Sequence, residues 1–347
     1  MISDDNSSQS GKSESRRKHK KVVRWLSVLL LAISGFLCVT LFPAYSFQPD
    51  FFAALTFWPA WIWALPGIAL CLAAVGASKR TRLCVTFVWI FFLVLVAEEA
   101  VGLLRSCVYP GKDGRTSCRE GICFRVVSLN CEGGNYDAAE GLLQYAPDVV
   151  LLQESPPIEG LRILAKRLFA NEGEFVLDGD TAVLARGRVI KTEVSHEHRL
   201  LMTGARVVLP SGLQVEAISV HLPPPATAIN LLSPDCWREH REDRQQRLER
   251  IAAIDKHLLT ISQDVPIVIG GDFNAKPWAG ATRILSRRLY DTFTKGGFGW
   301  PGTGPAHFPL WRVDQIWVSR DFKTISVRSK DCANSDHRVV ICDLCRL

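Results

Sequence analysis

Three long apolar stretches come first in this chain, before any alternating pattern. Trp25–Phe42 is an uncharged run of eighteen residues, and Phe51–Ala77 and Leu83–Leu104 follow it. A membrane-spanning helix needs about 20 predominantly apolar residues, so each stretch can cross a bilayer once its ends are included. A signal peptide is the competing interpretation of the first stretch, but no A-x-A-like cleavage site follows it and two more apolar stretches do. The pattern predicts three membrane-spanning helices within residues 22–104.

The charged residues beside these stretches predict their orientation. Residues 1–21 are polar, and their serine-rich first part is typical of a disordered tail. This tail ends in the basic run Arg16–Lys21, and Ser78–Arg82 forms a second basic segment. Positive charge favours the cytoplasmic side, so three spans place the tail in the cytoplasm and everything after Leu104 outside. Contact with nucleic acid is the alternative role of the basic run.

Two acidic residues, Glu98 and Glu99, lie near the end of the third apolar stretch. We expect both of them at the outer interface of the membrane. A role with lipid or with a partner helix is the alternative, because carboxylates inside membranes are usually functional.

From residue 122 onward, short apolar strands replace the long stretches. Residues 105–121 are rich in glycine, serine and charge, and we expect them to be a linker. Active sites of α/β sheets favour strand ends, so the polar residues that follow the strands are candidates for chemistry. The predicted strands include Ile122–Leu129, Val149–Leu152, Ala182–Ala185, Leu213–Val220 and Ile267–Ile269. The polar residues that follow them are Asn130, Glu154, Arg186, His221, Asp272 and Asn274.

The stretch Pro266–Pro277 concentrates this chemistry. Its apolar run Ile267–Ile269 is typical of a buried strand, and two glycines end it. Asp272 and Asn274 follow with one residue between them, so both side chains can face one side. A bare Asp-x-Asn pattern is also typical of an Asx turn that closes a strand. That alternative weakens here because further motifs of the same kind accompany it in a set order.

The set of motifs resembles a known superfamily. In chain order the motifs are SLNCEGG at 128–134, LLQES at 151–155, AVLAR at 182–186, SVHLP at 219–223, GGDFN at 270–274, WRVDQIWVS at 311–319 and SDHRVV at 335–340. Together they resemble the endonuclease/exonuclease/phosphatase superfamily, which includes pancreatic deoxyribonuclease, abasic-site endonucleases, neutral sphingomyelinases and inositol-polyphosphate 5-phosphatases. The resemblance covers residues 122–347. It implies a four-layer α/β sandwich of two mixed β-sheets flanked by helices, here preceded by an α-helical transmembrane region.

The resemblance also implies roles for single residues in the attack of water on a phosphoester. A magnesium site usually takes one or two protein carboxylates and completes its shell with water and substrate phosphate, and manganese is the alternative ion. The implied metal ligands are Asn130, Glu154 and Asp336. The implied catalytic residues are Asp272, which orients or activates the water, Asn274, His221 and His337, which contact the phosphate, and Asp314, which holds His337 in one tautomer.

Two further assignments are left with alternatives. Asp180 is expected to be the acidic partner of His221, with a surface-loop position as the alternative. Arg186, Arg241 and Arg244 are candidates for binding the anionic substrate. Arg241 and Arg244 belong to a helix of mixed charge within residues 229–259, and such a pattern is also typical of a solvated helix face.

The amino-acid composition narrows the range of expected functions. Hydrophobic residues make up 48% of the 347, and their excess lies before residue 105. The formal net charge is +6, but no basic run after residue 105 compares with the N-terminal one, and a nuclease needs a continuous basic groove. There are eleven cysteines, and an exported domain allows disulfides. Cys107, Cys118 and Cys123 fall in a loop-like linker where a bridge can form, but the sequence does not define the pairing.

The predicted protein is therefore an integral membrane enzyme, similar to bacterial three-span members of the superfamily, with an extracytoplasmic metal-dependent phosphohydrolase domain. Its substrate is expected to be a phosphodiester, a phosphomonoester or a lipid-linked pyrophosphate. A surface-bound nuclease is the first alternative, and a binding module with a decayed site is the second. No protein partner is implied.

Overall fold

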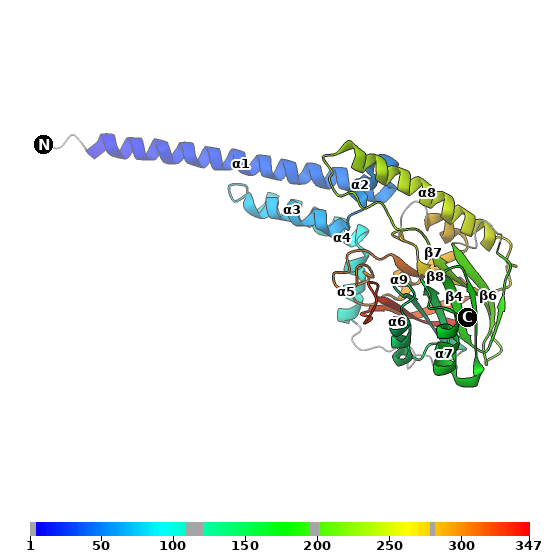
Figure 1. The fold of residues 1–347 in the computed structure, drawn as a ribbon. Coiled ribbons are helices and arrows are strands. Elements are labelled where there is room, and N and C mark those ends of the chain that lie inside the picture. The colour runs from blue at the N-terminus through cyan, green and yellow to red at the C-terminus, as the bar shows by residue number, and fades with distance from the viewer. Residues whose placement is uncertain (1–4, 109–120, 195–200, 278–281) are drawn as a thin grey trace. The chain divides into compact units, whose positions relative to one another are not determined.

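The computed structural model describes residues 5–108, 121–194, 201–277 and 282–347. The chain divides into two compact units, Met1–Ala97 and Glu98–Leu347, which we call the helical unit and the α/β unit. Each unit is described by itself below. Figure 1 labels their helices and strands.

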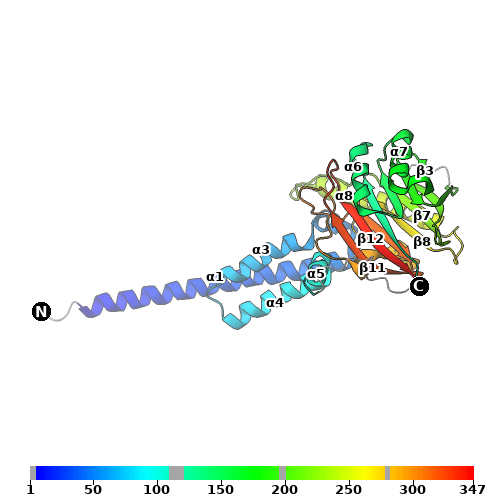
Figure 2. The same ribbon diagram turned by 90° about the horizontal axis from the view of Figure 1, so that it is seen from below.

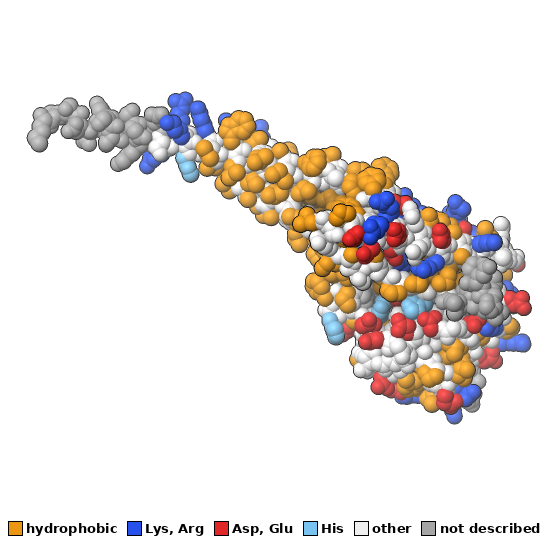
Figure 3. Space-filling model, turned by 45° about the horizontal axis from the view of Figure 1, so that its top comes forward, with side chains coloured by type: hydrophobic (Ala, Val, Ile, Leu, Met, Phe, Trp, Pro, Cys, Tyr) orange, Lys and Arg blue, Asp and Glu red, His pale blue; other side chains and the backbone are white. Residues whose placement is uncertain are grey.

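The helical unit is a bundle of apolar helices. Its elements are α1 (Asp5–Phe47), the 3-10 turn Asp50–Phe52, α2 (Ala53–Thr56), α3 (Ala60–Ala73) and α4 (Lys79–Val96). The helices α1, α3 and α4 run alongside one another around the buried Trp89 and Phe92 (Figure 2). The Trp89 indole N–H donates to Ser34 Oγ at 2.9 Å. Many other large apolar side chains of this unit are exposed, as Figure 3 shows in orange, and a lipid solvent would cover such a surface.

The helices differ from the three predicted spans in their continuity and in the end of the third span. Only α1 is by itself long and apolar enough to cross a membrane, and the described residues supply up to three spans if two broken helix pairs each count as one. The predicted third span ends early, because α4 stops at Val96 and Ala97 adopts an extended backbone. Glu98 and Glu99 then form the first turn of a new helix, where acidic side chains favour the N-terminal end of the helix dipole.

The polar tail also differs from its prediction. The helix α1 begins at Asp5, inside the segment for which the sequence predicts disorder. A long apolar helix that is already formed removes the cost of nucleation, so the lysine, arginine and glutamate residues before it can extend the same helix. The predicted linker 105–121 begins inside the helix α5 (Glu98–Val108), and its residues 109–120 lie outside the described part of the chain.

The α/β unit contains two six-stranded mixed sheets, as the motif resemblance implies. The order in the first sheet is β11 (Phe322–Lys330), β12 (Val339–Arg346), β1 (Cys123–Asn130), β2 (Val149–Gln153), β4 (Thr181–Arg186) and β3 (Gly173–Asp178). The order in the second sheet is β5 (Arg188–Lys191), β6 (Met202–Val208), β7 (Gln214–His221), β8 (Ile267–Asp272), β10 (Asp314–Ser319) and β9 (Leu289–Asp291). The described strands pair antiparallel except for β1 with β2 and β7 with β8.

Helices cover the outer faces of the two sheets and complete four layers. The first sheet packs against α6 (Tyr136–Glu140) and α7 (Ile158–Phe169), and the second packs against α8 (Pro234–Leu258). A third apolar core fills the space between the sheets. The shorter elements are 3-10 turns at Gly141–Tyr145, Ala170–Glu172 and Thr282–Arg287, the helix α9 (Thr292–Gly296) and α5. The predicted four-layer α/β sandwich is confirmed.

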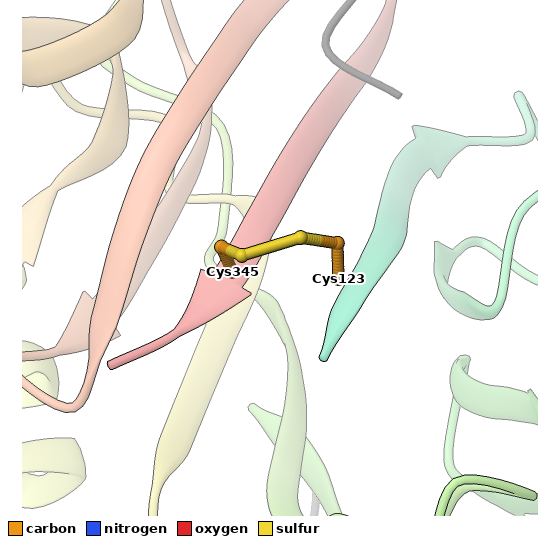
Figure 4. Close-up of a disulfide and its surroundings, with 2 residues drawn as sticks. All are labelled: Cys123 and Cys345. Atoms are coloured by element: carbon orange, nitrogen blue, oxygen red, sulfur yellow. A yellow bond between two sulfur atoms is a disulfide. The ribbon is translucent and has the colours of Figure 1, made fainter. Parts of the chain in front are cut away.

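One disulfide ties the first strand to the last. Cys123 of β1 and Cys345 of β12 are register partners, and their sulfur atoms are bonded (Figure 4). The sequence left this pairing open. Cys107, which the sequence grouped with Cys123 in a loop-like linker, is a free and exposed residue of α5.

Candidate active site

Five strands bring their polar ends to one edge of the two sheets. The strands β1 and β2 are parallel, so Asn130 lies beside Gln153 and just before Glu154. The strands β7 and β8 are also parallel, and His221 pairs in register with Asp272. The strand β10 runs the other way and begins at this edge, which sets Asp314 opposite Asp272. Figure 3 shows histidine side chains beside a row of Asp and Glu side chains on this unit.

Hydrogen bonds join the two sheets at and below this edge. The buried Asn130 donates from Nδ2 to Glu154 Oε1 at 3.1 Å and to Asp272 Oδ2 at 3.3 Å, so it links a carboxylate of each sheet. Below it, Gln153 Nε2 donates to Ser219 Oγ at 2.9 Å. Both Gln153 and Ser219 are fully buried, and paired buried polar groups fix one register of the sheets.

Glu154 is held in a fixed position by the turn after β1. The backbone N–H of Gly133 donates to Glu154 Oε2 at 2.6 Å. Glu154 itself has a φ of 44°, a conformation that costs on the order of 1–3 kcal/mol for a residue with a side chain. The fold therefore maintains a strained residue in order to present this carboxylate at the strand end.

Two histidines approach Asp272 from opposite sides in the same manner. His221 Nδ1 lies 2.5 Å from Asp180 Oδ2, and its Nε2 lies 4.0 Å from Asp272 Oδ2. His337 Nδ1 lies 2.8 Å from Asp314 Oδ2, and its Nε2 lies 3.8 Å from the same oxygen of Asp272. In each ring a carboxylate fixes Nδ1, so Nε2 faces the centre of the site. The expected pairings of Asp314 with His337 and of Asp180 with His221 are both present.

The charges around these rings favour their protonated forms. Burial lowers the pKa of His337, but the charge and hydrogen bond of Asp314, together with Asp272, outweigh it and raise this pKa to about 10. The pKa of His221 is also raised, because the hydrogen bond and charge of Asp180 outweigh the effect of burial. His337 can therefore act as a positively charged donor near neutral pH, and the surroundings of His221 shift it in the same direction.

Asp272 occupies the centre of this arrangement. Burial and the nearby Asp314 raise its pKa to about 6, although His337 and a backbone N–H act in the opposite direction. The N–H of Asn274 donates to Asp272 Oδ1 at 2.8 Å, and Asn274 Nδ2 donates to Asp272 Oδ2 at 3.1 Å and to the carbonyl of Leu222 at 2.7 Å. In this structure Asn274 thus holds the carboxylate of Asp272 in place.

The cluster has the donor atoms that a divalent cation needs. One ligand atom each of Asp272, Asp314 and His337 lies within 4.8 Å of the others, a group that could hold a metal ion once His337 gives up the proton that its raised pKa favours. Asp314 Oδ1 is buried without a hydrogen-bond partner, and a nearby cation offsets the cost of such an oxygen. Asn130 and Glu154 add oxygen donors, which magnesium prefers. The residues therefore fit a metal, and the group of Asp272, Asp314 and His337 differs from the predicted set of Asn130, Glu154 and Asp336.

Asp336 lies next to this cluster but does not belong to it. Its side chain is exposed, and its backbone carbonyl accepts from the N–H of Ala306 at 2.6 Å. The charge of Asp336 contributes to the raised pKa of His337, which places the two residues close together. Its part in a metal shell stays a prediction.

The position of Arg186 in the sheet contradicts the prediction that this residue binds substrate. The strand β4 is antiparallel to β2, and Ala185 pairs with Val149 at the start of β2. Arg186 therefore lies at the opposite end of the sheet from Glu154, and its guanidinium is 3.8 Å from Asp148. The local pattern of an apolar run before Arg186 did not reveal the direction of the strand.

The two arginines predicted on α8 have separate surroundings. Arg241 is exposed on the helix and Arg244 is half-buried. Their roles in substrate binding stay predictions.

Sequence reasoning missed Arg247, which is buried on the same helix. Its Nη1 donates to the carbonyls of Pro223 at 3.1 Å and Phe273 at 3.2 Å, while Nη2 binds Asp243 at 2.7 Å. These carbonyls belong to the segments that leave β7 and β8, directly after His221 and Asp272. A signal was present, because Arg247 falls in the apolar stripe of Ile251, Ile254 and Leu258.

Thr303 was also missed. Its buried hydroxyl accepts from the backbone N–H groups of Val313 at 3.1 Å and Asp314 at 3.0 Å, so it fixes the start of β10. No pattern around Thr303 distinguishes it from the other polar residues of its Gly- and Pro-rich loop.

The chain belongs to the endonuclease/exonuclease/phosphatase family, whose sequence model matches residues 127–337, more than half of its length. No curated protein matches the chain. Among solved structures, it is similar to the endonuclease/exonuclease/phosphatase from Bacteroides vulgatus, with 15% identity, a TM-score of 0.51 and coverage of 65% of this chain and 100% of that one.

Two further structures are similar at lower scores. The mannosyl-6-phosphatase of Bacteroides thetaiotaomicron has 16% identity and a TM-score of 0.48, with 64% of this chain and 99% of that chain covered. D. rerio TDP2 complexed with a single-strand DNA product has 18% identity and a TM-score of 0.46, with 64% and 98% covered. Likeness at this level of identity concerns the fold, and it does not assign a substrate.

Proposed function

We propose that the protein is a membrane-anchored, magnesium-dependent phosphohydrolase whose α/β unit lies outside the cytoplasm and attacks a phosphoester with water. The observation that carries this proposal is the convergence of His221 and His337 on one buried carboxylate, Asp272. A binding module with a decayed site would not need both rings fixed by carboxylates. Manganese is the alternative ion.

The residues suit an in-line attack on phosphorus. Asp272, with a pKa raised to about 6, is ionised near neutral pH and can accept a proton from the attacking water. His221 and His337 present N–H donors to the phosphoryl oxygens, whose negative charge grows in the transition state. Asn274 and Asn130 keep Asp272 oriented through hydrogen bonds. A magnesium ion held by Glu154, Asn130 and Asp336, a set that leaves both histidines free to contact phosphate, would supply further neutralisation of phosphoryl charge.

The membrane anchor supports a lipid-linked substrate. A chain with at least one helix able to cross a membrane keeps its active site near lipid, and a phosphate or pyrophosphate on a lipid carrier is concentrated there. Three spans, formed by α1, by the broken pair Asp50–Thr56 and Ala60–Ala73, and by α4, would place the α/β unit outside the cytoplasm. The disulfide between Cys123 and Cys345 supports the same side, because disulfides persist in oxidising compartments.

The test uses the full chain in lipid nanodiscs with magnesium. Three substrates are supplied separately: a prenyl pyrophosphate, a phospholipid and plasmid DNA. We expect phosphate release from lipid-linked substrate, its loss with a chelator, and its recovery when magnesium is restored. The inactive variant is His221→Ala, which removes a phosphate donor, and the matched control is Arg238→Ala, which changes an exposed residue of α8.

The outcomes separate the alternatives. DNA cleavage that His221→Ala abolishes would make the protein a surface-bound nuclease and would remove the lipid proposal. Cleavage of no substrate at all, with magnesium bound in a calorimetric titration, would favour a narrow specificity. Absence of both activity and metal binding would support the binding-module alternative.

A further inference from the structure

The helix α5 (Glu98–Val108) is joined to the α/β unit by charged and backbone contacts along one face. Glu98 Oε2 lies 2.6 Å from Arg312 Nη2, and Arg312 makes two more hydrogen bonds to Asp291, at 2.7 and 2.9 Å. Arg105 donates to the carbonyls of Phe293 at 3.1 Å and Thr294 at 2.6 Å. Arg312 and Asp291 are buried, so α5 is part of this unit rather than a segment that leads to it.

The centre of that face is a close backbone contact. The N–H of Gly299 donates to the carbonyl of Gly102 at 3.1 Å. A Cβ atom at Gly102 would lie 2.4 Å from the carbonyl oxygen of Gly299, a distance that no side chain can tolerate. The helix therefore has a defined rotation about its axis, with Glu98, Gly102 and Arg105 toward the unit.

The opposite face of α5 is entirely apolar. At 100° per residue, Ala100, Leu103, Leu104 and Cys107 lie opposite the residues that contact the unit, and Val101 and Val108 flank this face. Leu104 is 65% exposed and Val108 is 58% exposed. A soluble helix would place charge here, and α5 carries its three charged residues on or beside the face that contacts the unit.

The position of α5 in the chain indicates what covers this face. Only Ala97 separates it from α4, an apolar helix that is a candidate for part of a membrane span. Two residues of extended chain reach at most about 7 Å, so the start of α5 cannot leave the vicinity of the end of α4. If α4 crosses a bilayer, α5 begins at the level where the bilayer meets water.

We propose that α5 is an interfacial helix that lies in a lipid surface, with Leu104 and Val108 among the lipids and Glu98, Gly102 and Arg105 holding the α/β unit. An amphipathic helix with one apolar face binds membranes in this way. Arg312 stands two residues before Asp314, so the same contacts connect the lipid surface to the strand that carries a residue of the active site. The proposal requires a membrane, but it does not depend on which phosphoester the enzyme cleaves.

The experiment measures the surroundings of Cys107, which lies on the apolar face and is free and exposed. The full chain, with Cys84 and Cys118 changed to serine, is labelled with bimane at Cys107 and reconstituted in vesicles of phosphatidylcholine and phosphatidylglycerol. Brominated lipid and aqueous iodide are then compared as quenchers. The control carries Cys107→Ser and Ser211→Cys, which moves the label to an exposed turn after β6.

The expected result is strong quenching of the Cys107 label by brominated lipid and little by iodide, with the reverse for the Ser211→Cys label. Failure of brominated lipid to quench the Cys107 label overturns the proposal in either of two ways. Quenching by iodide instead would place this face in water. Resistance to both quenchers would place it against protein.

Discussion

The candidate catalytic residues gain their properties from partners that lie far away in the sequence. His337 lies just before β12, but its tautomer is set by Asp314 on β10, and its Nε2 lies 3.8 Å from Asp272 on β8. His221 likewise pairs with Asp180, 41 residues earlier in the chain. Single substitutions of the partners therefore test the site without removing the groups that are proposed to contact the substrate.

The first prediction concerns Asp314→Asn. The amide keeps the size of the side chain but can no longer hold a charged imidazole, so the pKa of His337 should fall and its Nδ1 lose a fixed acceptor. We expect activity to fall on the order of 10²-fold or more, as for loss of a positioned proton-transfer group. A steady-state assay measures kcat beside Asp264→Asn, which changes an exposed carboxylate before β8. Activity within tenfold of the parent would show that the pair is dispensable.

The second prediction concerns Arg247, which we regard as a positioning residue. Arg247→Ala leaves two buried carbonyls and Asp243 without their partner, and loss of a buried charged group of this kind costs about 3 kcal/mol. The expected result is a lower midpoint of chemical unfolding and a lower kcat, with partial recovery in Arg247→Lys. Arg238→Ala, at an exposed arginine of the same helix, is the matched control, and equal behaviour of the two alanine variants would contradict the role.

Individual elements show how far the sequence could predict this structure. The strands that end at Asn130, Glu154, His221 and Asp272 were predictable, because each is a short apolar run with a polar residue at its end. The direction of β4 was not, and Arg186 was assigned to the wrong end for that reason. The break at Ala97 was not predicted, because apolar residues resume at Ala100 after the two glutamates that follow it. In the structure Glu98 pairs with Arg312, 214 residues further along the chain, a contact that no local pattern reveals.

The third prediction concerns the packing of α5 against the rest of the α/β unit. Gly102→Val introduces a side chain where the carbonyl of Gly299 already stands, and overpacking of this kind costs about 1–3 kcal/mol. We expect a lower unfolding midpoint of the α/β unit, measured by loss of activity after heating in detergent. Val101→Ala, one position along the same helix but on its exposed face, should leave the midpoint unchanged. Equal midpoints for parent and Gly102→Val would mean that α5 does not pack as described.

At the scale of the whole molecule, the α/β unit is closed by the bond between its first and last strands. The bond between Cys123 and Cys345 spans 222 residues of the chain, and a long loop gives a disulfide a large effect on the entropy of the unfolded state. The two strands also pair directly, with six register pairs from Cys123 to Ser128. The bond therefore secures a contact that the sheet already makes.

The fourth prediction follows from that bond. Cys123→Ser should lower the free energy of unfolding by about 2–4 kcal/mol and leave kcat at low temperature nearly unchanged, because the bond lies at the end of β1 remote from Asn130. Denaturation in urea with and without reductant measures the difference. Cys236→Ser, at a free and buried cysteine of α8, serves as the control. If reductant lowers the stability of the parent protein and of Cys123→Ser equally, the effect of reductant comes from a group other than this disulfide.

The hydrogen bonds by which Asn130 links Glu154 to Asp272 have a consequence for how the protein should lose activity on heating. Glu154 belongs to one sheet and Asp272 to the other, so the distance between them measures how well the two sheets fit together. A small shear of one sheet against the other would separate the carboxylates while every strand kept its own hydrogen bonds. Activity should therefore disappear on gentle heating before circular dichroism registers any loss of strand, which makes turnover a more sensitive gauge of the fold than its secondary structure.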